Sequence, residues 1–471
     1  MLFKNKIFFL ILLCVFDKSL LKEIVSDEKL LFVLEHFRHG ARGAYKSFNY
    51  NEWKDYLNED WKGAGELTQL GMRQHYLLGY SVRNKYKNFI SKEFDPNEIY
   101  IISTDVNRTL ISAYSNLLGM YHNSSNLDKK GFIKNNNYSN IINNKIFEEE
   151  KLQNIFPIHI FNEKDLRYQL YRTEVCPGFE TFINKISESE RMKNILINIF
   201  DKTNKNYGKY ISQFIDQNII DKKDYKSYFK VLKNICDTFI ADYFDGRNVE
   251  DLSKTGINMD EFYEHCLNVS LITVYYSYYG VPLEKSVEFG ISPTFREIFE
   301  YMDKRILLDK ENNPDKIVSA SPKFVIISGH DVSLAAFDLF FENKFNIKYK
   351  RADYANNQIF ELWKKGDKYY LKYLINLETS GEFEYYEFKK EVLKDLYNDE
   401  EIRKICYADN YVTFKQLYYN KMKKINMIII TIIFVLLFFT IFLKLKKKSN
   451  INVFQYKIIE TENMQSARTN L

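Results

Sequence analysis

Short apolar runs alternate with helically spaced segments in the first third of the chain, and the same alternation returns near its end. Apolar runs of a few residues bounded by polar ones indicate buried strands, whereas apolar residues three and four apart indicate one face of a helix. The expected strands lie at residues 30–34, 99–102, 156–161, 324–327, 358–363 and 369–375. The expected helices between them lie at residues 67–80, 109–121 and 332–341.

The middle of the chain has a different pattern. It shows little β signal, and amphipathic helical spacing dominates at residues 179–186, 225–239 and 259–277. Strands and helices in alternation, interrupted by helices alone, predict an α/β core with an inserted, mostly helical cap. We assign residues 28–164 and 304–410 to the core and residues 165–303 to the cap insertion.

Two longer apolar runs lie outside this alternation, one near each end. Residues 7–16 follow two lysines and are too few to span a bilayer, which predicts a secretory signal peptide over residues 1–20. The alternative is a buried first strand. Residues 425–443 carry no charge and are flanked by lysines that can reach the bilayer surface, which predicts one transmembrane helix.

These two segments predict a single-pass type I membrane protein. Residues from about 20 to 424 would be lumenal or extracellular, and residues 444–471 would form a cytosolic tail. Tyr456 and Ile459 in the tail fit the tyrosine-based sorting signal that clathrin adaptors bind. The predicted location is therefore lysosomal, endosomal or another endomembrane compartment, or the plasma membrane.

The formal net charge of +5 is concentrated in these terminal segments. The tail contributes +4 and the signal peptide +2, which leaves −1 for the rest of the chain. Nucleic-acid binding needs a strongly basic face, so a nearly neutral main region argues against a nucleic-acid partner.

Four cysteines remain after Cys14 is assigned to the signal peptide, namely Cys176, Cys236, Cys266 and Cys406. In an oxidising compartment they allow two disulfides in three connectivities. None of them has the spacing of a structural zinc site.

Glycosylation sequons occur at Asn123, Asn137 and Asn268, on segments that we expect at the surface. A fourth sequon, at Asn107, lies inside the candidate site described next, so we expect it to remain unmodified.

Three short polar motifs each follow an expected strand. They are Arg38-His39-Gly40-Ala41-Arg42, Ser103-Thr104-Asp105 with Arg108, and His330-Asp331. In open α/β sheets, ligands bind beyond the carboxyl ends of the strands. We therefore expect motifs about 290 residues apart to meet in one crevice.

The residue types in these motifs predict phosphoryl-transfer chemistry. The candidate phosphate ligands are Arg38, Arg42, Arg108 and His330. Guanidinium groups match phosphate because they are planar, permanently charged forks. His39 lies between two arginines, whose charges disfavour the imidazolium form and keep the ring nucleophilic. Asp331 is suited to protonate a leaving alkoxide and then to deprotonate water.

Each motif taken alone has another explanation. A histidine after a strand is often a packed structural group, and Arg108 near a helix start has Asp105 as an alternative surface partner. His330-Asp331 would also serve as a structural hydrogen-bonded pair or a helix cap. A metal site built from His36 and Glu35 is a weaker alternative, because His36 should face away from His39 or pack.

In combination, the three motifs resemble the signatures of the histidine acid phosphatase family, branch 2 of the histidine phosphatase superfamily. The matching segments are RHGxR at residues 38–42, an STDxxRT-like segment at 103–109 and HD at 330–331, within a similarity that covers residues 28–410. The resemblance implies a phosphoglycerate-mutase-like mixed sheet, a phosphohistidine at His39, acid catalysis by Asp331 and no metal or other cofactor.

The resemblance also implies a disulfide between Cys176 and Cys406, which leaves Cys236 to pair with Cys266. The chain departs from the family where the first signature often continues to a proline, because it has Gly43 there. It has His-Asp where phytase-type members have His-Ala-Glu, which favours general phosphomonoesters over phytate as substrates.

The predicted function is an acid phosphatase that hydrolyses phosphomonoesters at a lumenal active site. Its single-span arrangement resembles the lysosomal, membrane-anchored members of the family, and members often form homodimers. The alternative in another class is an inactive phosphatase fold that acts as a receptor or surface binding protein. The presence of every catalytic side chain favours the enzyme.

Overall fold

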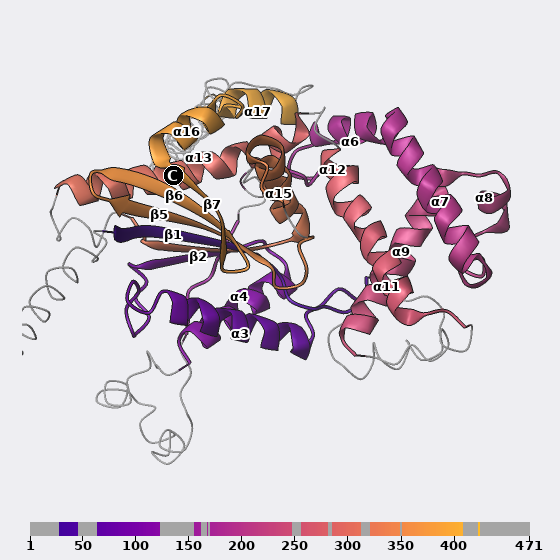
Figure 1. Cartoon of the computed structure of the whole chain (residues 1–471), viewed down its shortest axis with the longest axis horizontal. Coiled ribbons are helices and arrows are strands. Elements are labelled where there is room, and N and C mark those ends of the chain that lie inside the picture. The colour runs from indigo at the N-terminus through magenta and orange to yellow at the C-terminus, as the bar shows by residue number, and fades with distance from the viewer. Residues whose placement is uncertain are drawn as a thin grey trace, which may run out of the picture. The chain divides into compact units, whose positions relative to one another are not determined.

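The computed structural model describes residues 28–45, 64–122, 155–161, 167, 170–246, 256–280, 285–311, 321–348, 351–407 and 423 (Figure 1). The predicted features outside these residues are the signal peptide at 1–20, the transmembrane helix at 425–443, the tail with Tyr456 and Ile459, and the sequons at Asn123 and Asn137. Within the described ranges, no helix is both long and apolar enough to cross a membrane.

A mixed seven-stranded sheet forms the centre of the folded region, in the order β3-β2-β4-β1-β5-β6-β7. The strands are β1 (Glu28–Arg38), β2 (Ile99–Ser103), β3 (His159–Ile160), β4 (Phe324–Gly329), β5 (Asn357–Lys365), β6 (Lys368–Ile375) and β7 (Glu378–Glu384). The pairs β3/β2, β2/β4 and β4/β1 are parallel, and the three remaining pairs are antiparallel. The predicted mixed sheet is confirmed.

Two of the expected strands have other bounds in the structure, and one strand of the structure was not expected. β1 continues through Arg38, so the first motif begins inside the strand. β3 has two residues where a strand over 156–161 was expected. β7 was missed because it is an edge strand that carries mostly polar, solvent-exposed residues and has no apolar run.

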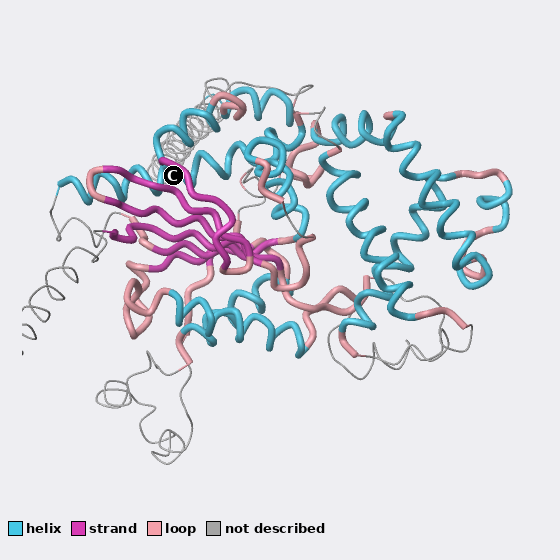
Figure 2. The backbone as a smooth tube through the Cα atoms, in the orientation of Figure 1, coloured by secondary structure: helices cyan, strands magenta, loops and turns pink. Residues whose placement is uncertain are grey.

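Helices cover both faces of the sheet (Figure 2). One face packs against α3 (Gln69–Lys85) and α4 (Asn107–Met120). The other face packs against α13 (Ser286–Glu311), α15 (Asp331–Phe345) and α16 (Tyr385–Leu393), and α17 (Asp399–Cys406) adds buried side chains to the same cluster. Successive residues of β1 point to opposite faces, so Val33 packs towards α3 and α4 while Phe32 and Leu34 pack on the other side.

The insertion consists of helices with a hydrophobic core of their own. Its elements are α6 (Phe179–Glu188), α7 (Glu190–Ile211), α8 (Gln217–Asp221), α9 (Tyr225–Phe244), α11 (Met259–Leu271), the π-helical turn η1 (Ile272–Tyr276) and α12 (Ser277–Tyr279). Side chains of α7, α9 and α11 form this cap core, which includes Phe200, Leu232 and Phe262.

The cap boundary that the sequence suggested at residue 303 falls inside α13. Phe295, Ile298 and Phe299 of that helix are buried in the cluster that covers the sheet, not in the cap core. The insertion therefore ends before Ser286. Sequence periodicity shows that a helix has an apolar face, but it does not show what that face packs against.

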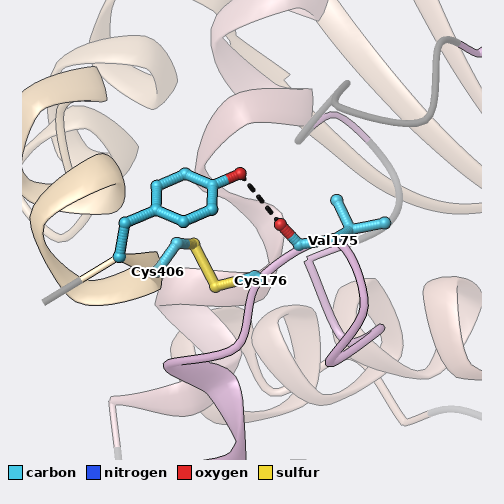
Figure 3. Close-up of a disulfide and its surroundings, with 4 residues drawn as sticks. Val175, Cys176 and Cys406 are labelled. Atoms are coloured by element: carbon cyan, nitrogen blue, oxygen red, sulfur yellow. Dashed lines mark hydrogen bonds between the residues drawn. A yellow bond between two sulfur atoms is a disulfide. The ribbon is translucent and has the colours of Figure 1, made fainter. Parts of the chain in front are cut away.

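Cys176 and Cys406 form a disulfide, as the family resemblance implied (Figure 3). The bond joins the segment that precedes α6 to the end of α17, across 230 residues of sequence. Two hydrogen bonds join the same two segments beside the disulfide. The Gly178 N–H donates to the Cys406 carbonyl (3.1 Å), and the Tyr407 hydroxyl donates to the Val175 carbonyl (3.0 Å).

The second expected disulfide is wrong. Cys236 of α9 and Cys266 of α11 are buried free thiols inside the cap core. Burial raises the pKa of the Cys266 thiol well above its usual range, and the neighbouring Cys236 raises it further. The two thiols thus interact without a bond and contribute as small apolar side chains.

Removing the disulfide is expected to lower the free energy of unfolding by about 2–5 kcal/mol, because the bond closes a very long loop. Cys176→Ser combined with Cys406→Ser should unfold at a lower denaturant concentration than the wild type. A reductant should lower the unfolding midpoint of the wild type to that of the double variant. Cys236→Ala is the control: it retains the disulfide, so a reductant should lower its midpoint as well. A wild-type midpoint that ignores reductant would contradict this expectation.

Candidate active site

The three motifs meet at one edge of the sheet. β2, β4 and β1 are adjacent and parallel, with Ser103 opposite Ser328 and Arg38 opposite Gly329. Their carboxyl ends therefore point the same way, and the residues that follow them lie together. The rings of His39 and His330 are 5.6 Å apart, so segments distant in sequence lie side by side.

His39 is held as a neutral ring with one free nitrogen. Its Nδ1 lies 2.8 Å from the Gly40 carbonyl, and a carbonyl can only accept, so Nδ1 carries the proton and Nε2 keeps its lone pair. Burial lowers the pKa of His39 well below 6.5, and the positive charges of Arg38 and Arg108 lower it further. The ring is 3% exposed, so it has the state that a nucleophile requires.

The three predicted arginines surround this ring, each fixed by a protein partner. Arg38 donates through Nη1 to the Ala352 carbonyl (2.7 Å) and pairs through Nη2 with Asp331 (2.8 Å). Arg42 makes a two-pronged ion pair with Asp237 of α9, with N–O distances of 2.6 and 3.2 Å. These contacts fix the direction of each guanidinium fork.

Each arginine also has a buried donor without a protein partner in the described part of the chain. The Nε–H groups of Arg38, Arg42 and Arg108 are buried, and none has a hydrogen-bond partner among the described residues. The three permanent positive charges act on His39 together, which fits an anion with several oxygens as the ligand. A phosphoryl group is such an anion, by its charge and by its oxygen count.

His330 of the third motif contacts two residues of the second motif. Arg108 Nη2 donates to its Nδ1 (3.3 Å), so the proton resides on Nε2, which donates to the Thr104 hydroxyl (3.0 Å). Burial lowers the pKa of His330 to about 3, with a further contribution from Arg108. Arg108 therefore contacts His330 in this site, and direct contact of His330 with phosphate stays a prediction.

Asp331 is the first residue of α15 and faces Arg38. Its Oδ1 accepts from the Val332 N–H (2.9 Å) while Oδ2 pairs with Arg38. Burial alone would raise the pKa of Asp331, but the charges of Arg38 and His330 outweigh it, and the pKa lies below 3.8. Asp331 is thus ionised in the free protein.

The loop after β1 is held by side chains of α3 and α4. The Gly40 N–H donates to the Ser112 hydroxyl (3.2 Å), and the Ala41 N–H donates to Gln74 Oε1 (2.8 Å). A Cβ on Gly40 would lie 2.4 Å from the Gly71 carbonyl oxygen. Gly40 is therefore required for packing against α3.

Three aromatic or acidic residues complete the site and were not identified from the sequence as site residues. Arg38 lies over the Tyr354 ring at 4.4 Å, and Arg42 lies over the Tyr45 ring at 4.1 Å. Asp237 is the third, on cap helix α9. No pattern could have revealed it, because a carboxylate on an amphipathic helix is indistinguishable from an ordinary solvated one.

The remaining candidates lie elsewhere. His36 Nε2 is 3.1 Å from the Ser333 hydroxyl, so His36 packs against α15 and does not face His39. In the part of the chain that the structure describes, no three metal-ligating side chains gather in one place. Asn268 is exposed on α11, as its sequon requires, and Asn107 is exposed at the start of α4, where it donates to Glu66 (3.3 Å).

Comparison with known proteins agrees with the geometry. The sequence model of the histidine phosphatase superfamily (branch 2) matches residues 21–376. Lysosomal acid phosphatase of Xenopus laevis is 40% identical over 99 residues, which are 21% of this chain and 22% of that protein. Prostatic acid phosphatase of Homo sapiens is 42% identical over 98 residues, which are 21% of this chain and 25% of that protein.

The aligned segment thus spans only about a quarter of the length of these relatives. Among solved structures, Hafnia alvei phytase in complex with myo-inositol hexakis sulphate superposes with a TM-score of 0.51 at 12% identity. The superposition covers 79% of this chain and 98% of the phytase. At that identity the likeness shows a shared fold alone.

Proposed function

The chain belongs to branch 2 of the histidine phosphatase superfamily, and we propose on this premise that it hydrolyses phosphomonoesters through a phosphohistidine on His39. The observation that carries the proposal is the buried, neutral His39 ring, whose Nε2 is free of a proton and which lies among the positive charges of Arg38, Arg42 and Arg108. Permanent positive charge, a neutral nucleophile and an adjacent carboxyl group are what this chemistry needs.

In the first step, Nε2 of His39 attacks phosphorus and the bond between phosphorus and the ester oxygen breaks. The three guanidinium groups stabilise the charge on the equatorial oxygens. Asp331, which carries the proton when substrate is bound, gives it to the leaving oxygen and prevents release of a free alkoxide.

In the second step, water attacks the phosphohistidine. Asp331, now ionised, takes a proton from that water while the bond between nitrogen and phosphorus breaks. Inorganic phosphate leaves, and His39 returns to the neutral ring with its proton on Nδ1, held by the Gly40 carbonyl.

The pH dependence of this reaction follows from the low pKa of Asp331. The lowered pKa keeps Asp331 ionised in the free protein, so the proton must arrive with the substrate as a phosphate monoanion. The second pKa of a phosphate ester is about 6. As pH rises through about 6, the monoanion disappears and kcat/KM should fall about tenfold per pH unit. His39 stays neutral below this range because its pKa is lowered.

Measuring kcat/KM from pH 4 to pH 8 with two esters of different second pKa tests this account and the proposed function together. The pH at which kcat/KM begins to fall should move with the second pKa of the ester. If kcat/KM fell at the same pH for both esters, the fall would be assigned to titration of a protein group. Absence of hydrolysis at every pH would favour the alternative, an inactive phosphatase fold that binds a ligand or scaffolds a surface.

We also propose the setting of this reaction. The apolar segments at residues 1–20 and 425–443 support a single-pass protein with a lumenal active site, and Tyr456 with Ile459 supports sorting by clathrin adaptors. Similarity to lysosomal acid phosphatases supports an endomembrane location. The family resemblance supports a homodimer, and the sequons support glycosylation, with Asn268 exposed.

A further inference from the structure

One helix passes from the cap to the sheet and changes its winding on the way. α11, η1 and α12 follow one another without a break from Met259 to Tyr279. The side chains of α11 are buried in the cap core, whereas those after the start of η1 are buried in the cluster that covers the sheet. The π-helical turn thus lies where the helix leaves one core and enters the other.

A π-helical turn contains one extra residue, which rotates all later side chains by about 100° around the helix axis. Tyr275 lies within η1 and Tyr279 lies four residues later in α12, and both are buried, at 0% and 1% exposure. Such turns are rare and are often retained at functional sites. What the two hydroxyl groups contact therefore matters.

The Tyr275 hydroxyl contacts the segment that holds Arg38. It donates to Asp338 Oδ2 (2.8 Å) and accepts from the Ala352 N–H (3.0 Å). The carbonyl of the same Ala352 accepts from Arg38 Nη1 (2.7 Å). Gln358 fixes the other oxygen of Asp338 (2.6 Å). Tyr275 therefore locates the backbone that orients the Arg38 fork.

The Tyr279 hydroxyl contacts the segment that holds Asp331. It donates to the Val332 carbonyl (2.9 Å), and the N–H of the same Val332 donates to Asp331 Oδ1 (2.9 Å). Asp331 and Arg38 are themselves joined at 2.8 Å. The two tyrosines of one helix thus support both members of this ion pair, each through a single residue.

We propose that Tyr275 and Tyr279 are positioning residues, which fix Arg38 for phosphate binding and Asp331 for proton transfer and so connect the cap helix to the chemistry. The inference rests on the proposed function, because it assigns roles through Arg38 and Asp331. Neither tyrosine need touch the substrate. A displacement of about 1 Å in such a site costs up to about a hundredfold in rate, so loss of one hydroxyl should be measurable.

The test uses the full chain and two conservative variants. Tyr279→Phe should slow hydrolysis of an alkyl phosphate about tenfold and that of a nitrophenyl phosphate less than about twofold, because only the poor leaving group needs the proton of Asp331. Tyr275→Phe should raise the inhibition constant of inorganic phosphate about tenfold, because it leaves the Ala352 N–H unpaired and Arg38 less well oriented.

Tyr385→Phe is the matched control. Tyr385 is also fully buried and donates to a carboxylate, Asp303 (2.8 Å), but its partners belong to α13. All three variants should lose similar stability, whereas only the first two should show the selective kinetic changes. Equal loss on both esters for Tyr279→Phe, or unchanged phosphate inhibition for Tyr275→Phe, would overturn the inference. An inactive wild type would instead overturn the proposed function.

Discussion

Replacement of His39 by alanine is expected to reduce hydrolysis of every phosphomonoester by a factor on the order of 10⁴ to 10⁶, as loss of the nucleophile does in other covalent catalysts. The ring is buried, neutral and surrounded by positive charge, and its free Nε2 has no counterpart on alanine. Steady-state assays with an aryl phosphate at mildly acidic pH provide the measurement.

The same variant should still bind inorganic phosphate, because Arg38, Arg42 and Arg108 remain. His122→Ala is a suitable control, since His122 is exposed at the end of α4 and should leave the rate unchanged. If His39→Ala kept substantial activity, a different nucleophile or direct attack by water would have to replace the proposed mechanism.

Replacement of Asp331 by asparagine is expected to separate good leaving groups from poor ones. An alkyl phosphate should lose about 10² to 10⁴ in kcat, the usual contribution of a positioned acid. Formation of the phosphohistidine from a nitrophenyl phosphate should change little, because its phenolate leaves without a proton. The measurement compares single-turnover rates of the two esters.

A uniform loss on both esters would give Asp331 a structural role. This alternative has a basis in the structure, because Asp331 also forms the ion pair that orients Arg38. Inhibition by inorganic phosphate distinguishes the two roles. It should be nearly unchanged if Asp331 acts as the acid, and much weaker if its main role is to hold Arg38.

The convergence of the catalytic motifs could be predicted from the sequence because it depends on local rules. Each motif follows an apolar strand, and the carboxyl ends of adjacent parallel strands meet at one edge of a sheet. The neutral state of His39 could also be predicted, since flanking arginines disfavour its charged form. These inferences need no knowledge of how distant helices pack.

The partners that depend on packing could not be predicted. Asp237 reaches Arg42 only because the cap folds over the first motif, and Gly40 is required only because Gly71 packs against it. Cys236 and Cys266 were paired by elimination, although the interior of the cap keeps them as buried thiols. Residues that contact across separate elements leave no periodic signal in the chain.

The central claim is that phosphate passes through His39. Asp331→Asn mixed with ³²P-labelled nitrophenyl phosphate should form the phosphohistidine but hydrolyse it slowly, because the base that activates water is lost. Alkaline quench, digestion and mass analysis should then find close to one phosphate per chain on the peptide that contains His39. The same treatment of His39→Ala should leave that peptide unlabelled. Continued hydrolysis by the wild type with no label on His39, or label on another residue, would contradict the account.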